Sequence, residues 1–247
     1  MKRTHDTMWK NNPSQKSVFV SNLVEHSFPA LDKDMSVKKV LDVACGNGLG
    51  VSLPLLRRGL KVHSFDHLNS ALKSVRENAE AEGFLVRTKR ASMYKTFPYE
   101  AGEFDATFCF AAIYHGRLEQ IMYALSEIKR VTRRGGYFFG NFLAITEIKY
   151  AAKKKMHYEI IRPVKNCGEK PVTGKPAAGK PFKAYRIIDK SEPHLFYFAS
   201  KDFEYMVPHY YFSEEELNVI LKQYFSQVKI TCLKKGLTGQ YFVHCRV

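Results

Sequence analysis

The sequence predicts an α/β fold: a doubly wound, mostly parallel seven-stranded sheet with an antiparallel last strand, covered on both faces as a three-layer sandwich. Three observations predict this fold. Apolar runs of strand length alternate with stretches of helical spacing along residues 37–142. The first such run leads directly into the glycine-rich stretch ACGNGLG. The chain has 247 residues, 45% of them hydrophobic, so it can bury a sheet of this size.

The first half of the sheet is expected to contain three strands, at 37–43, 60–65 and 84–88. A short helix within 49–58 joins the first two strands. Asn69 is expected to cap a second helix, whose apolar residues recur at helical spacing, and Gly83 is expected to end it.

The second half continues the alternation, with a strand at 104–110, a helix at 118–131 and a strand at 137–142. Much later, Ser213 and Glu216 form a capping-box pattern ahead of an apolar helix. The last two strands are expected at 227–233 and 240–247. Because the link between them is short, we expect them to pair antiparallel at one edge of the sheet.

A basic insertion is expected after the fifth strand. The net charge of the chain is +15, and residues 143–190 hold twelve Lys or Arg against four Asp or Glu. Lys-Pro recurs there every five residues, at Lys170, Lys175 and Lys180. Proline and glycine at this density predict a solvated loop. The alternative interpretation is an arm that contacts the phosphates of RNA, since clustered lysines attract a polyanion.

The cysteines and the terminus narrow the class of protein further. Five cysteines are scattered without metal-ligand spacing, so the sequence predicts neither a disulfide framework nor a metal site. The amino terminus has no apolar stretch of signal-peptide length, and no eighteen apolar residues run together. We therefore expect a cytoplasmic protein that does not enter a membrane.

The glycines after the first strand predict a ligand-binding loop. Bare backbone between a strand end and a helix start lets N–H groups approach a nucleotide-like ligand closely. Gly46, Gly48 and Gly50 alternate, and Val51 stands where the dinucleotide fingerprint requires its third glycine. The spacing therefore disfavours a nicotinamide enzyme.

These residues resemble the class I S-adenosylmethionine-dependent methyltransferases, and in particular the methyltransferase type 11 group. DVACGNG at 42–48 matches the family's first motif, (D/E)-x-G-x-G-x-G, except that Ala44 replaces the first glycine. The resemblance continues in order with Asp66, with ASM at 91–93, with FDATFCFAAIYHG and with EIKRVTRRGGYFFGNF. It covers residues 38–142 and, more loosely, 209–247.

The resemblance implies S-adenosylmethionine as the cofactor and assigns roles to residues that follow the strands. Asp42 would shape the end that holds the amino-acid part, and Asp66 would accept both ribose hydroxyls. Ser92 stands where many relatives place an aspartate for the adenine amino group. The residues expected to bind the cofactor are Asp42, Ala44, Cys45, Gly46, Gly48, Asp66, His67, Ser92, Met93, Phe110 and Ala111.

The acceptor side is less constrained. His115, just past the fourth strand, and His209, before the last helix, are the candidate catalytic bases, because an unperturbed imidazole titrates near neutrality. Trp9, Tyr114 and Tyr210 are the candidate substrate contacts. Ordinary packing is the alternative interpretation for all five side chains.

The resulting hypothesis is a methyltransferase acting on a nitrogen or oxygen nucleophile of a small molecule, as a monomer or weak dimer. One alternative is an RNA methyltransferase, of tRNA or cap type, that uses the lysine-rich insertion. Another is a non-catalytic binding domain. The expected regions are an arm or lid at 1–36, a cofactor-binding core at 37–142, an insertion or substrate region at 143–208, and the rest of the core at 209–247.

Overall fold

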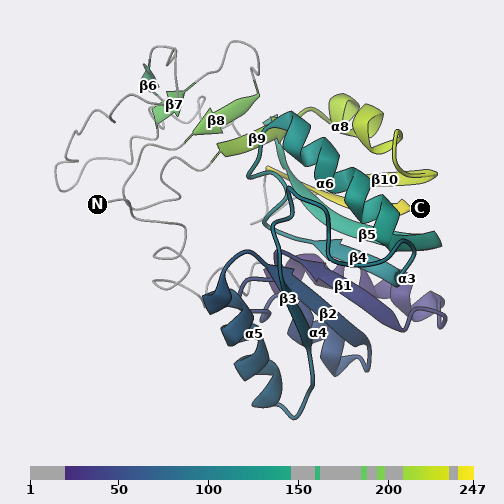
Figure 1. Cartoon of the computed structure of the whole chain (residues 1–247). Coiled ribbons are helices and arrows are strands. Elements are labelled where there is room, and N and C mark those ends of the chain that lie inside the picture. The colour runs from purple at the N-terminus through teal and green to yellow at the C-terminus, as the bar shows by residue number, and fades with distance from the viewer. Residues whose placement is uncertain (1–19, 146–158, 162–184, 188–193, 198–207, 234–238) are drawn as a thin grey trace.

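The computed structural model describes residues 20–145, 159–161, 185–187, 194–197, 208–233 and 239–247 (Figure 1). The predictions for Trp9, Cys167 and the Lys-Pro repeat lie outside these residues. The helices and strands are α3 (Phe28–Lys33), β1 (Lys39–Val43), α4 (Ser52–Arg57), β2 (Lys61–Asp66), α5 (Asn69–Glu80), β3 (Arg87–Arg90), β4 (Phe104–Cys109), α6 (Leu118–Val131), β5 (Thr132–Ala144), β6 (Glu159–Ile161), β7 (Tyr185–Ile187), β8 (Leu195–Tyr197), β9 (Pro208–Phe212), α8 (Glu214–Leu221), β10 (Gln227–Cys232) and β11 (Gln240–Arg246).

The central sheet has the strand order β10-β11-β5-β4-β1-β2-β3. All neighbouring strands from β5 to β3 in this order pair parallel. Strand β11 pairs antiparallel with both of its neighbours, β5 and β10. The prediction of a mostly parallel α/β sheet with an antiparallel last strand is confirmed. The expected number of strands was too small, because β8 and β9 join the same sheet and make it nine-stranded.

Helices cover both faces of the sheet, in three layers (Figure 1). On one face, apolar side chains of α6 and α8 form a buried cluster with sheet residues such as Leu41 and Phe138. On the other face, α3 and α4 form a second cluster with the neighbouring sheet residues Val40 and Phe139. Adjacent residues of one strand thus belong to opposite clusters, as the two-residue period of a strand requires.

The long strand β5 changes its neighbour along its length, and this creates the edge where the site lies. Its pairing with β4 ends at Cys109 and Gly140. Three residues later, β9 takes over on β5, with Leu143 opposite Tyr211. Residues that follow β4 therefore leave the sheet at the point where β9 enters it.

The third strand lies later in the sequence than predicted. The third strand is Arg87–Arg90 rather than 84–88, because Phe84 closes the turn after α5 by donating its N–H to Ala79 O. Phe84 packs against the α4 side of the sheet, which explains why its apolar character resembled that of a strand residue. Gly83, with φ of +77°, lies in that turn, as expected.

The helix caps were predicted with mixed success. Asn69 is the first residue of α5 and not its cap; Leu68 holds the cap position and no side chain caps the helix. Ser213 does cap α8, accepting the Glu216 N–H at 3.1 Å. The Glu216 carboxylate bonds instead to Tyr210 and His194, at 2.8 Å each, so it serves a tertiary contact.

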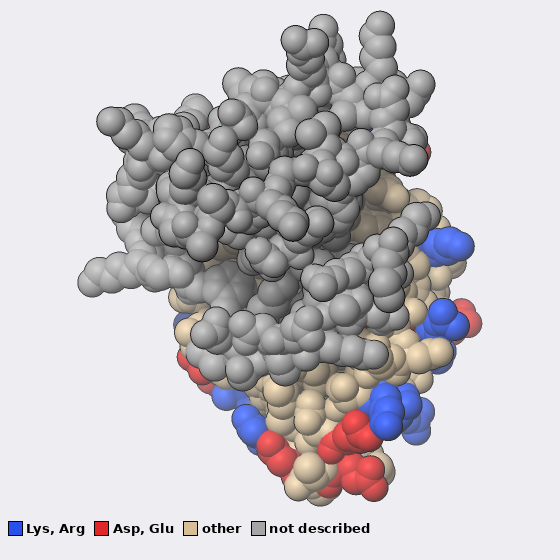
Figure 2. Space-filling model, turned by 90° about the vertical axis from the view of Figure 1, so that its left-hand side faces the viewer, with Lys and Arg blue, Asp and Glu red and all other residues tan. Residues whose placement is uncertain are grey.

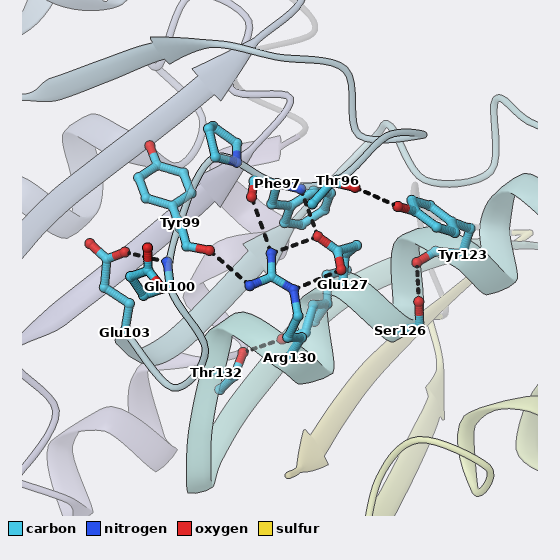
Figure 3. A network of polar contacts seen from close by, with 12 residues as sticks. Thr96, Phe97, Tyr99, Glu100, Glu103, Tyr123, Ser126, Glu127, Arg130 and Thr132 are labelled. Carbon is cyan, nitrogen blue, oxygen red and sulfur yellow. Dashed lines mark hydrogen bonds and ion pairs between the residues drawn. The ribbon is translucent and has the colours of Figure 1, made fainter.

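A network around Arg130 of α6 fixes the segment between β3 and β4 (Figure 3). The guanidinium forms two bonds of 2.7 Å with the Glu127 carboxylate and donates to the carbonyls of Tyr99 and Phe97. Glu127 also accepts the Phe97 N–H at 2.6 Å. The hydrogen bond from Arg130 lowers the pKa of the Glu127 carboxyl, so the pair stays ionised. The connection from β3 to β4 contains no helix, and this network holds it against α6.

Candidate functional site

The loop after β1 reverses direction through left-handed backbone. Ala44, Gly46 and Gly48 have φ of +56°, +53° and +75°. The alanine that replaces the first glycine of the motif thus keeps the conformation that glycine adopts easily, at a cost of about 1–2 kcal/mol for an L residue. Strain of this kind persists where the surrounding structure holds it and gathers at functional sites.

Gly48 cannot carry a side chain where it lies. A Cβ atom there would be 2.2 Å from Val75 Cγ2 of α5. The loop is also held to β2, because Cys45 donates its N–H to Phe65 O at 3.1 Å. The glycine therefore lets the loop pack closely between the sheet and α5.

Asp66 joins the loops that follow β1 and β2. One carboxylate oxygen accepts the Gly46 N–H at 3.1 Å, and the other accepts the Leu68 N–H at 3.0 Å and lies 3.3 Å from His67 Nδ1. Only 6% of Asp66 is exposed. A carboxylate offers about four acceptor positions, so two oxygens in this place can still accept hydroxyl groups.

Asp42 lies beneath the loop. Its carboxyl is buried and accepts the Ser52 hydroxyl of α4 at 2.5 Å; Ser52 in turn lies 2.9 Å from the Ser64 hydroxyl of β2. Burial raises the pKa of Asp42 to about 7, and the charge of Asp66 adds to the rise, although the Ser52 bond opposes it. Asp42 therefore supports the loop from the sheet side, through its hydrogen bond with Ser52 of α4.

Tyr94 connects the loops that follow β3 and β4. Its hydroxyl donates to Ile113 O at 3.2 Å. Its ring packs against Gly116 so closely that a Cβ atom on that glycine would lie 2.8 Å from Tyr94 Cζ. Ser92, two residues earlier, accepts the Tyr94 N–H at 3.3 Å, and Met93 packs partly buried against the core. The predicted adenine contacts thus lie on a segment fixed to the end of β4.

The end of β4 has a second left-handed alanine. Phe110 is buried, and Ala111 has φ of +52°. The Ala111 N–H donates to Asn141 Oδ1 of β5 at 2.6 Å, and Asn141 Nδ2 donates to Gln240 Oε1 of β11 at 2.6 Å. Sequence reasoning missed Asn141 and Gln240. The available signal was the one amide in the apolar strand YFFGNF.

The two candidate bases come together although 94 residues separate them in the sequence. The rings of His115 and His209 lie with centroids 4.5 Å apart at 87°, an edge-to-face arrangement. The ring centroid of Tyr114 lies 4.5 Å from that of His115 and 6.1 Å from that of His209. The Tyr210 N–H donates to Tyr114 O at 2.8 Å, which fixes β9 beside the segment after β4.

The structure separates the two tyrosines of β9. Tyr210 packs into the core on the α8 side, and its hydroxyl donates to Glu216. Tyr211, on the other side of the strand, clusters with Tyr114 and Leu143 near the histidines. Tyr211 was not among the predicted site residues, because the alternation of β9 could not be assigned before its pairing with β5 was known.

The described cysteines have no disulfide partner. Cys109 and Cys245 are buried, and burial raises the pKa of both thiols. The pKa of Cys45, in the loop after β1, is raised in the same way and further by Asp42. These thiols therefore stay protonated and pack as small apolar side chains.

The residues that the structure describes form neither a metal-binding cluster nor a membrane-spanning helix. No group of three or more His, Cys, Asp or Glu side chains lies close enough to hold a metal ion in this part of the chain. No helix of the described part has the length and apolar character needed to cross a bilayer.

Comparison with solved structures supports the fold. A protein from Pyrococcus horikoshii OT3 superposes with a TM-score of 0.65 at 20% identity, over 96% of this chain and 92% of that one. A methyltransferase described as S-adenosylmethionine-dependent, from Methanosarcina mazei, gives 0.60 at 16% identity, over 85% and 92%. The magnesium protoporphyrin IX methyltransferase from Synechocystis PCC 6803, with bound S-adenosylhomocysteine, gives 0.58 at 15%, over 95% and 87%.

The comparison of sequences assigns the core. No curated protein sequence matches the chain. Residues 40–136 match the family model described as a methyltransferase domain, a segment that runs from β1 to the start of β5 and includes both left-handed alanines. The chain therefore contains a class I S-adenosylmethionine-dependent methyltransferase domain with a Rossmann-like fold.

Proposed function

We propose that the protein transfers the methyl group of S-adenosylmethionine to a nitrogen or oxygen atom of a small molecule. The observation that carries this proposal is the contact between His115 and His209 at the carboxyl edge of the sheet, beside the left-handed end of β4. Two imidazoles there can accept a proton from an incoming nucleophile.

The residues at this edge fit the cofactor. The left-handed loop at Ala44 to Gly48 brings bare backbone to the ligand side, and Asp66 offers carboxylate oxygens for the ribose hydroxyls. Ser92 and Met93 supply a hydroxyl and an apolar surface for the adenine ring. When bound, S-adenosylmethionine supplies an electrophilic methyl group. The chain itself holds the cofactor, and Phe110 and Ala111 form a wall that excludes water from the methyl group.

On the acceptor side, the protein orients the nucleophile and removes its proton. Displacement at a methyl group gains most from holding the acceptor in line at attack distance. His115 or His209 takes the proton of an N–H or O–H acceptor, and the neighbouring ring fixes its orientation. Tyr114 and Tyr211 line the same region with aromatic surface, which suits a planar acceptor.

The described surface favours a small acceptor over RNA. On the face shown in Figure 2, acidic and basic side chains are interspersed over the part that is not grey. Ion pairs such as Arg57–Glu82 and Lys73–Glu77 neutralise basic groups of the cofactor half. The structural neighbour from Synechocystis is named for a porphyrin acceptor. The regions proposed as lid, 1–36, and substrate region, 143–208, would complete the acceptor pocket.

The test is a transfer assay with methyl-labelled S-adenosylmethionine against separate metabolite and RNA fractions. We expect label in the metabolite fraction. With the acceptor identified, His115→Gln or His209→Gln should lower kcat by about 100-fold or more, the usual contribution of a general base, with cofactor affinity unchanged. His194→Gln, in the turn just before β8, is the matched control and should retain activity. Label in RNA alone would overturn the small-molecule acceptor.

A further inference from the structure

Asn141 is a buried amide in the middle of an apolar strand. Asn141 is fully buried in β5, directly before Phe142 of the core on the α6 side. Both ends of the amide are bonded, to the Ala111 N–H and to Gln240 Oε1, at 2.6 Å each. A buried amide is destabilising unless it is fully hydrogen-bonded, so this geometry is strongly specified.

The amide fills a gap in the backbone pairing of the sheet. The β4–β5 pairing ends at Cys109 and Gly140, and the β9–β5 pairing begins at Leu143. The Ala111 N–H comes two residues after Cys109, the last paired residue of β4, where the ladder offers it no backbone partner. The Asn141 side chain takes the place of that partner and satisfies this partly buried N–H.

The same bond acts on a strained residue. Ala111 has φ of +52°, a conformation that an L residue keeps only where its surroundings impose it. The turn it makes determines where Phe110 and Ala112 lie and sends the chain toward Tyr114 and His115. Gln240, the first residue of β11, holds the other end of the Asn141 amide.

We propose that Asn141 is a positioning residue for methyl transfer. Its bond to the Ala111 amide holds the end of β4 as the wall beside the transferred methyl group, and Gln240 couples that wall to the carboxy-terminal strand. This inference rests on the proposed function, because that function makes the end of β4 the methyl-facing wall.

The experiment compares Asn141→Leu with Thr107→Val. Leucine has a similar size and forms neither bond. Thr107 is equally buried, on β4, and bonds to Thr132 Oγ1 at 2.7 Å. Thr132 is the first residue of β5 and lies opposite Phe104, at the end of the strand pair away from the site. Both variants thus lose a side-chain hydrogen bond between β5 and the chain of β4, and Asn141→Leu also loses the bond to Gln240 of β11. Of the two residues, only Asn141 adjoins the site.

Two readouts follow for each variant. Calorimetry measures the Kd of S-adenosylmethionine and of S-adenosylhomocysteine, which lacks the methyl group, and hydrogen exchange measures protection of the Ala111 amide. We expect Asn141→Leu to weaken S-adenosylmethionine about 10-fold and S-adenosylhomocysteine about threefold, with Ala111 exchange about 10-fold faster. Thr107→Val should leave the ratio of the two Kd values and the Ala111 exchange unchanged.

Two further variants keep the proposal decidable. Asn141→Leu combined with Ala111→Gly should regain most of the Kd ratio, since glycine adopts a positive φ without steric cost. If Asn141→Leu does not fold, Gln240→Leu decides, with an expected shift of about twofold in the ratio. A folded Asn141→Leu or Gln240→Leu with the wild-type ratio overturns the proposal. Wild-type protein that binds neither ligand overturns the proposed function itself, and the inference with it.

Discussion

The two halves of the site are built in different ways. The cofactor half, from β1 to α5, brings together residues close in sequence: Asp42 meets Ser52, and Asp66 meets Gly46. The acceptor half joins distant segments: His115 meets His209, and Ala111 reaches Gln240 through Asn141. A local half can be identified from one motif, whereas a half assembled by strand pairing cannot.

The largest expected effect tests the close packing of the cofactor half. Gly48→Ala places a methyl group 2.2 Å from Val75 Cγ2 on backbone with φ of +75°. Overpacking and left-handed strain together should lower the free energy of unfolding by about 3 kcal/mol. Denaturant unfolding measures this. Adding Val75→Ala to Gly48→Ala should restore the part of the unfolding free energy that is lost to overpacking, and not the part lost to backbone strain. If Gly48→Ala alone leaves the free energy of unfolding unchanged, the loop is not packed as described.

The next largest effect is the pH dependence of stability that Asp42 gives to the cofactor half. The pKa of Asp42 is raised to about 7 in the fold, from 3.8, so the folded state binds the extra proton between these values. Stability from this group is therefore complete below about pH 4 and falls as pH rises toward 7. Relative to Asp42→Asn, the wild type should lose about 2–3 kcal/mol between pH 5 and pH 8. Parallel stability curves for the two proteins would contradict the raised pKa.

Asp66→Ala sharpens the comparison at the level of ligand binding. It removes the acceptor proposed for the ribose hydroxyls, together with the bond to the Gly46 N–H. Affinity for S-adenosylmethionine should fall by about 1–3 kcal/mol, the cost of leaving hydrogen-bonding groups unpaired. Titration calorimetry measures it, with Asp105→Ala at the other end of the sheet as the control. Unchanged affinity in Asp66→Ala would remove the ribose assignment.

The smallest expected effect lies in the support of the acceptor half. Tyr210→Phe deletes only the hydroxyl that donates to Glu216. Stability should fall by about 0.5–1.5 kcal/mol, the net value of one such bond, while cofactor affinity stays constant. Thermal unfolding and calorimetry together check this. A large loss of cofactor affinity would mean that β9 and the cofactor half are coupled, and the division into two halves would be wrong.

Much of the cofactor half was predictable because its signals are local. The alternation of strand and helix, the glycine loop and the strand-end aspartates all lie within 37–83, and α6 begins and ends at the predicted residues. The errors there were also local. The sequence predicts Asn69 as a cap, although Leu68 holds that position, and it predicts Phe84 as a strand residue, although Phe84 closes a turn.

Some roles depended on the tertiary structure because they depend on which strand pairs with which. That β9 takes over from β4 along β5 decides that His209 meets His115, and that Tyr211 rather than Tyr210 joins the acceptor cluster. It also leaves the gap that Asn141 fills. By itself, the sequence determined the fold class, the family resemblance and the loop that carries the cofactor motif, since period and spacing act over a few residues. Only the tertiary structure decided the acceptor half, because pairing between residues about a hundred positions apart leaves no mark in the local pattern.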